Sequence, residues 1–238
     1  MQARAFYLPA PGKSEQAKQR LLEAALAVFG EKGPKAATVR EIAKAAGQNV
    51  AAIEYYFGGK DNLYAAVMEG IVREIRHQLA DVLAEVEAGR EAGGGSPAEA
   101  LRLLKLYLRS VYLRLLSRDD MKPFARLIVR EQMQPTAGFE ILYGKGFGQL
   151  HEMLCELMGA ALGRNPRERE IIARTHAVMG QVYFFVMARE AFLRRIGWHS
   201  LAGRNATMVA DLVAEHVDVL IRVLSARPAS SPSHAKLL

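Results

Sequence analysis

Hydrophobic side chains recur at three- and four-residue intervals through most of the chain, a pattern that indicates amphipathic helices. The first predicted helix covers about residues 15–32, with Ser14 as its expected N-cap and Gly33-Pro34 as its stop. Its apolar stripe comprises Leu22, Ala25, Leu26 and Phe29. A second stripe predicts a long helix over about residues 60–89, formed by Leu63, Val67, Ile71, Ile75, Leu79, Leu83 and Val86.

Further helices are predicted after the glycine-rich segment at residues 89–97. Ser96 and Glu99 fit a capping box, with Pro97 at the first helical position. Breaks at Pro135, at Asn165-Pro166 and at residues 196–203 then place helices at about residues 97–116, 119–132, 136–163, 166–195 and 204–225. Since no segment convincingly alternates as a strand would, the sequence predicts an all-α fold.

The last two long helices carry apolar residues on more than one face. One contains Ile171, Ile172, Val178, Met179, Val182, Phe185 and Val186; the other contains Val209, Leu212, Val213, Val217, Leu220, Ile221 and Leu224. A helix with one buried side needs only one stripe. The surplus indicates either a dimer interface or deep burial within one subunit.

A helix-turn-helix is predicted between residues 38 and 57. Thr38 is a good N-cap for a short helix that begins at Val39, and Gly47 supplies the positive φ that ends it. Asn49 can cap a second short helix, from Val50 to about residue 57. Two short helices across a glycine turn can place the second helix in a DNA major groove.

These residues resemble the TetR family of bacterial transcriptional regulators, over about a fifth of the chain. The matching positions are Thr38, Ile42, Ala43, Ala46, Gly47, Ile53, Tyr56, Phe57, Lys60 and Leu63. The segments NVAAIEYYFGGKDNLY and RLIVREQMQPT are most similar to the CecR-type subgroup. The resemblance implies an N-terminal three-helix DNA-binding domain and a larger C-terminal helical domain for ligand binding and dimerisation. It also implies that the last two long helices pair across a two-fold axis.

The candidate DNA-binding residues cluster in and around the helix-turn-helix. Helical spacing turns Ile53 and Phe57 inward, so Ala51, Ala52 and Tyr55 should face outward, and either alanine could touch a thymine methyl. The resemblance adds phosphate or groove contacts from Thr38, Arg40, Tyr55, Tyr56 and Lys60, although Tyr56 could equally be a packed aromatic. Gln48 and Asn49 replace the Val-Ser of many relatives, and Glu54 replaces a tyrosine or asparagine. The operator sequence therefore cannot be transferred from relatives.

Charge supports this assignment of the DNA-binding end. Residues 1–60 contain nine Lys or Arg against five acidic residues, which is +4 of the chain's net +7. Phosphate binding needs such a concentration of positive charge, although solubility alone would also explain it. The expected organisation is an arm at 1–13, a DNA-binding domain at 14–60, an effector-binding and dimerisation domain at 61–226, and a disordered tail at 227–238.

The middle helices carry the aromatic, methionine and polar side chains typical of a ligand pocket. The candidates are Tyr107, Phe124, Arg130, Met133, Phe139, His151, Met179, Tyr183 and Met187. Glu131, beside Arg130, could fix a polar ligand or be solvated. The glycines at 144, 146 and 148 are better explained by close helix contact or a kink than by a phosphate loop.

Other chemistries have weak support. His151 and Cys155 lie one helical turn apart, but no third ligand completes a metal site, and Cys155 is the only cysteine. No nucleophile motif indicates an enzyme. We therefore expect no metal and no cofactor, a cytoplasmic location and no membrane span. The predicted protein is a homodimeric regulator, a repressor that a small-molecule effector releases from a quasi-palindromic double-stranded operator. The alternatives are a ligand-independent architectural DNA-binding protein and a helical protein-interaction module.

Overall fold

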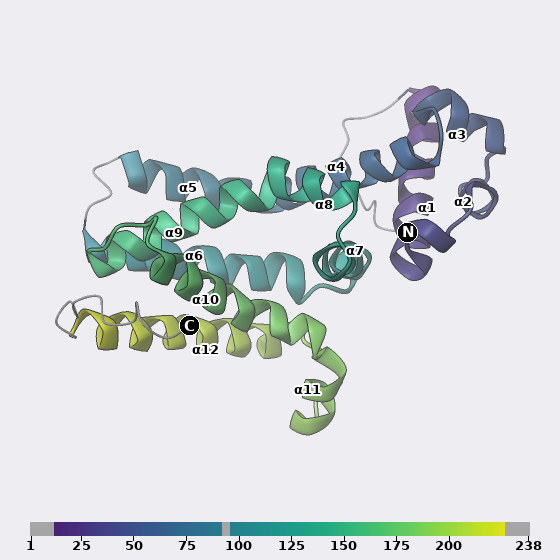
Figure 1. The fold of residues 1–238 in the computed structure, drawn as a ribbon. Helices are drawn as coiled ribbons and strands as arrows, with labels where there is room; N and C mark the ends of the chain where they lie inside the picture. The colour runs from purple at the N-terminus through teal and green to yellow at the C-terminus, as the bar shows by residue number, and fades with distance from the viewer. Residues whose placement is uncertain (1–11, 92–95, 227–238) are drawn as a thin grey trace, which may run out of the picture.

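The computed structural model describes residues 12–91 and 96–226, and every regular element in these ranges is helical. Figure 1 shows a small group of helices at one end of a longer helical body. This small group, called the head below, comprises α1 (Lys13–Ala36), α2 (Val39–Ala45) and α3 (Val50–Phe57). The predicted all-α class is confirmed.

The head has its own apolar centre. Phe29, Ile42 and Ile53 bring one buried side chain from each helix, and Leu63 joins them from the start of α4. Gly33 interrupts α1 with a φ of +79°, which confirms the predicted break at Gly33-Pro34. The predicted N-cap at Ser14 is wrong, because α1 begins at Lys13 after Gly12.

The body is built on α4 (Lys60–Gln78), which runs out of the head and packs against both α1 and α3. The single helix predicted for residues 60–89 is wrong, because Leu79 separates α4 from α5 (Ala80–Glu91). The apolar stripe nevertheless continues across the break, since Leu79, Val82 and Val86 are all buried. Sequence periodicity therefore could not distinguish one helix from two.

The rest of the body alternates long helices with short irregular turns. The helix predicted to start at Asn165-Pro166 begins three residues later, at Arg169, and the predicted helix to residue 195 breaks at Ala188. Pro97 at the first turn, the Ser96 cap and the last helix are as predicted, but the Glu99 carboxylate of the predicted capping box accepts from Arg102 instead. These elements are α6 (Pro97–Val111), η1 (Tyr112–Leu116), η2 (Asp119–Met121), α7 (Lys122–Met133), α8 (Ala137–Leu142), η3 (Tyr143–Phe147), α9 (Gly148–Leu162), α10 (Arg169–Met187), α11 (Arg189–Ile196) and α12 (Arg204–Ser225).

The segment with glycines at 144, 146 and 148 forms a π-helical turn, η3, between α8 and α9. A Cβ on Gly146 would lie only 3.3 Å from both methyl groups of Val72 on α4. The glycine therefore lets the two helices approach closely, as the sequence predicted in place of a phosphate loop.

The long body helices lie roughly side by side, while α11 points away from them (Figure 1). The chain turns by 75° between α10 and α11. Among residues 12–91 and 96–226, no single helix is long and apolar enough to cross a membrane, and only this bent pair passes the test of length and composition together.

Besides α4, the body meets the head through α7, which packs against both α1 and α8. Glu131 of α7 is completely buried there. Its carboxylate accepts hydrogen bonds from the Tyr64 hydroxyl at 2.5 Å and from the Thr136 backbone N–H at 2.9 Å. Of the two roles considered from the sequence, surface solvation is wrong, because this carboxylate ties α4, α7 and the start of α8 together.

Candidate DNA-binding and effector sites

The first helix of the helix-turn-helix is fixed by a complete capping box. The Thr38 hydroxyl accepts from the Glu41 N–H at 3.3 Å, and the Glu41 carboxylate accepts from the Thr38 N–H at 3.0 Å. Lys32 donates to the same carboxylate at 2.5 Å. This hydrogen bond from Lys32, with those from Thr38, lowers the pKa of Glu41 to about 2. Gly47 then turns the chain with a φ of +63°.

The second helix, α3, has one largely exposed face, on which two of the side chains are alanines. Asn49 caps it, because its side-chain oxygen accepts from the Ala52 N–H at 2.9 Å. Ile53 is buried, whereas Ala51 is exposed, Ala52 is half-buried and the Tyr55 side chain is 82% exposed. The predicted orientation is therefore confirmed for Ala51, Ile53 and Tyr55, whereas Ala52, predicted to face outward, and Phe57 are half-buried against the core. Small side chains on the exposed face leave the backbone free to approach base edges.

The two tyrosines of α3 have different environments. The Tyr55 and Tyr56 rings meet edge to face with centroids 4.9 Å apart. Tyr56 is half-buried, and its hydroxyl lies 3.3 Å from the Ser14 hydroxyl of α1. Tyr56 is thus a packed aromatic that also carries a polar group at the surface of the head.

The remaining candidates border this surface. Arg40 is exposed and Gln48 is half-buried. Lys60 donates to the Lys35 carbonyl at 3.4 Å, so its ammonium lies against the end of α1. Glu54 is exposed, and its carboxylate lies 3.7 Å from where a Cβ on Gly59 would be.

Within the body, four of the predicted pocket residues converge on one small cavity. Tyr107, Phe124, Met179 and Tyr183 line a space of about 40 Å³, called the inner cavity below, together with apolar residues of α4, α6 and α9. Burial raises the pKa of Tyr183 to about 12 and raises that of Tyr107 still further. Both phenols are therefore neutral hydrogen-bonding groups at physiological pH.

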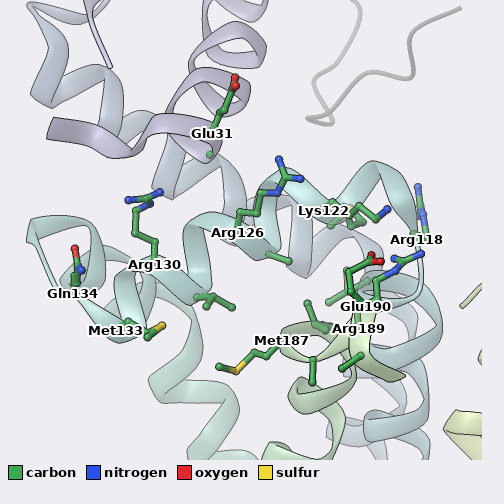
Figure 2. A pocket seen from close by; sticks show the side chains of 18 residues that line it. Glu31, Arg118, Lys122, Arg126, Arg130, Met133, Gln134, Met187, Arg189 and Glu190 are labelled. Carbon is green, nitrogen blue, oxygen red and sulfur yellow. The ribbon is translucent and has the colours of Figure 1, made fainter. Parts of the chain in front are cut away.

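Three other predicted pocket residues line a separate and much larger cavity. Arg130, Met133 and Met187 belong to a cleft of about 820 Å³ between the end of α1, α7 and the α10–α11 bend. Figure 2 shows this cleft, called the junction cleft below. Sequence reasoning missed its other cationic members, which are Arg118, Lys122, Arg126 and Arg189. The signal was present, because the first three and Arg130 follow one another at four-residue steps.

Phe139 and His151 line neither of these two cavities. Phe139 stacks on Tyr143 with ring centroids 5.8 Å apart. The His151 Nδ1 lies 3.6 Å from the Cys155 sulfur, and burial with the nearby His176 lowers the pKa of His151. Within the described ranges no three His, Cys, Asp or Glu side chains are grouped as metal ligands.

Comparison with known proteins identifies both parts of the chain. The profile of the bacterial regulatory proteins of the tetR family matches residues 21–67. The profile described as the C-terminal domain of the HTH-type transcriptional dual regulator CecR matches residues 100–224. The dual regulator CecR of Shigella flexneri is 37% identical over 217 residues, which are 90% of this chain and 96% of that protein. The regulator BetI of Brucella anthropi is 34% identical over 84 residues, which are 35% of this chain and 43% of BetI.

Solved structures share the fold. AibR, in complex with isovaleryl coenzyme A and operator DNA, aligns with a TM-score of 0.62 at 17% identity, covering 84% of this chain and 97% of AibR. HlyIIR, a hemolysin II transcriptional regulator, aligns with a TM-score of 0.55 at 24% identity, covering 87% of this chain and 98% of HlyIIR. The family matches and the helix-turn-helix lead to one assignment: the chain belongs to the TetR family of bacterial regulatory proteins, in the group with a CecR-type C-terminal domain.

Proposed function

We propose that this protein is a dimeric, DNA-binding transcriptional regulator that a small-molecule effector releases from its operator. The observation that carries the proposal is the head, where α3 exposes Ala51 and Tyr55 on a helix-turn-helix fixed by two side-chain caps. The names of CecR and BetI as transcriptional regulators support it. On this proposal the protein is not an enzyme, and it works in the cytoplasm, where the chromosome is accessible.

The DNA contacts are assigned to one surface of the head. Ala51, Ala52 and Tyr55 would meet base edges, while Thr38, Arg40, Tyr56 and Lys60 would hold phosphates beside them, with Gln48 and Asn49 at the turn. The capping geometry limits two of these roles. The Thr38 hydroxyl accepts the Glu41 N–H and already donates its proton to the Glu41 carboxylate at 2.9 Å, so a phosphate contact from Thr38 would compete with that hydrogen bond. The Asn49 oxygen accepts the Ala52 N–H, so Asn49 can offer its amide N–H₂.

The dimer interface is assigned to α10 and α12. These helices leave large apolar side chains exposed, and the side chains are Ile172, Phe184, Met187, Met208, Leu212, Val219 and Val223. Such an exposed apolar surface marks an interaction site. Leu220, by contrast, is partly buried against the core of its own subunit, so it does not report on this interface.

The operator and the switch follow from this assembly. Two heads related by a two-fold axis would bind half-sites of a quasi-palindrome, with centres about 34–36 Å apart or a multiple of this. An effector in the body would release DNA only if it binds the two head arrangements with different affinity. We assign the DNA-binding domain to residues 14–60 and the effector and dimerisation domain to residues 61–226. The shared α4 starts at that boundary.

The proposal is tested by measuring, through fluorescence anisotropy, how tightly the protein binds DNA from the region upstream of its gene. Tyr55→Ala should weaken specific binding, because it removes the most exposed aromatic of α3, while Tyr143→Ala on the body is the matched control. Equal affinity of wild type and Tyr55→Ala would show that α3 does not contact DNA. A ligand-independent architectural protein would bind the same DNA yet stay bound with every effector tested.

A further inference from the structure

The junction cleft carries a ridge of positive charge. Lys122, Arg126 and Arg130 follow at four-residue steps on α7, with Arg118 one step before them and Arg189 on the opposite wall. Residues four apart share one helix face, so these like charges repel one another. Figure 2 shows the guanidinium groups of Arg126 and Arg130 on the α7 wall of the cleft.

The neighbouring acids neutralise only part of this ridge. Asp119 pairs with Lys122 and Arg189, and Asp120 pairs with Arg118. Within residues 12–91 and 96–226, Arg126 and Arg130 form no ion pair. Two acidic side chains also line the cleft, Glu31 and Glu190, and the Glu31 carboxylate points away from it (Figure 2).

Two arginines that line this cleft each carry a guanidinium N–H that is buried without an acceptor. The Nε atoms of Arg130 and Arg189 are shielded from solvent and have no hydrogen-bond partner in the described part of the chain. A buried donor of this kind is costly unless something pairs with it. An anion in the cleft would relieve the repulsion along α7, and it would supply these acceptors only if the two side chains move, because neither Nε is reached by solvent in this structure.

The junction cleft and the inner cavity are separate spaces that share part of their walls. Leu115, Met121 and Ala125 belong to the walls of both spaces. A molecule with its charge among the arginines would therefore have its apolar part against these three side chains. Beyond them lie the neutral phenols of Tyr107 and Tyr183.

We propose that the effector is an anionic amphiphile, with its phosphate, carboxylate or sulfonate group in the junction cleft and its apolar part along the wall shared with the inner cavity. This inference rests on the proposed function and names the chemical class of its effector. The cleft also explains how binding reaches the head. The Arg130 guanidinium lies against Gly33 at the end of α1, where a Cβ would come within 2.5 Å of Nη1. An anion that engages Arg130 competes with this contact between body and head.

The test uses two fluorescent probes that differ only in a sulfonate group, which makes one of them an anion. These are 8-anilino-1-naphthalenesulfonate and N-phenyl-1-naphthylamine, which has the same aromatic frame without the sulfonate. Binding is measured by probe fluorescence for the wild type, for the Arg126→Gln/Arg130→Gln double variant and for Arg195→Gln. Arg195 is an exposed cation on α11 outside the cleft, so its variant controls for the loss of one positive charge elsewhere on the surface. Circular dichroism confirms that each variant is folded.

The double variant should bind the sulfonate probe at least about tenfold more weakly, since charge-assisted hydrogen bonds are lost. The affinity of the double variant for the neutral probe should change by less than about twofold, and Arg195→Gln should bind both probes as the wild type does. Unchanged sulfonate affinity in the double variant would overturn the proposal, as would an equal loss of the neutral probe.

A DNA-binding measurement with the same proteins and probes distinguishes failure of this inference from failure of the proposed function. The sulfonate probe should weaken binding of the wild type to its upstream DNA, and this effect should be lost in the double variant. If the protein binds no specific DNA, the proposed function fails while the probe comparison still decides the site. If the double variant loses DNA affinity and the sulfonate probe does not bind the cleft, the cleft is part of the DNA surface and the inference is wrong.

Discussion

Replacing Tyr64 by phenylalanine should reveal how strongly the head-to-body joint depends on the buried Glu131 carboxylate. Tyr64→Phe removes one hydroxyl, which donates to Glu131 at 2.5 Å, and leaves the ring that packs edge to face on Phe29 with centroids 4.9 Å apart. Burial raises the pKa of Tyr64 well above its usual value, and so does its hydrogen bond to Glu131, so the phenol stays protonated as the donor. The carboxylate keeps its bonds from Thr136.

Hydrogen bonds to charged groups contribute about 1.5–3 kcal/mol, and the completely buried acceptor places this one within that range. A loss of about 2 kcal/mol would raise the unfolding equilibrium constant about 30-fold. Urea unfolding at one fixed protein concentration measures this change, since a dimer's stability depends on concentration. Tyr143→Phe is the matched control, because its ring is more than half exposed and should cost less than about 0.5 kcal/mol. A Tyr64→Phe variant as stable as this control would refute the role of the hydrogen bond.

Three further predictions follow from the head and the dimer. Lys60→Ala should weaken DNA binding and lower the slope of affinity against salt by about one unit in anisotropy titrations at several salt concentrations, whereas an unchanged slope would exclude a phosphate contact. Leu212→Glu, on the exposed face of α12, should give folded monomers in sedimentation, while Leu220→Glu should unfold the protein. Because the pKa of Glu41 is lowered from 4.5 to about 2, its stabilising effect should be present above pH 4.5 and disappear as the pH falls towards 2. Carboxyl NMR titration should show this pKa rising in Lys32→Ala, and no rise would contradict the ion pair.

The head could be predicted almost completely because its signals are local. Thr38, Gly47 and Asn49 each act within three or four residues of the chain, and all three have the capping or turning role that the sequence predicts. The exception is Ser14, since a serine near a helix start need not be its cap. The outward face of α3 followed from helical spacing alone.

The breaks in the body helices could not be predicted, for a physical reason. Leu79 and Ala188 end helices without a glycine or proline, and the helix after each break still adds buried apolar side chains to the core, Val82 and Val86 from α5 and Leu193 from α11. At η3, by contrast, the glycine run gave the signal for an irregular turn. Local sequence rules detect breaks made by backbone preference but miss breaks made by tertiary packing.

Of the two candidate effector sites, one could be predicted from the sequence and the other could not. Tyr107, Phe124, Met179 and Tyr183 were predicted as pocket residues because their type suits a pocket, and they do share one cavity. The junction cleft required knowledge of where α1, α7 and α11 meet, which no single segment contains. The spacing of its arginines was visible in the sequence, but a row of charges on one helix usually indicates only a solvated face.

The most direct test of the account is a selection of binding sequences from random double-stranded DNA by the full-length protein. We predict one enriched quasi-palindrome, with half-site centres about 34–36 Å apart or a multiple of this, because two heads would bind across a two-fold axis. Tyr55→Ala, which changes only the exposed face of α3, should fail to enrich the same sequence. Enrichment of no sequence by the wild type, or of the same palindrome by both proteins, would contradict the claim that this chain regulates transcription through α3.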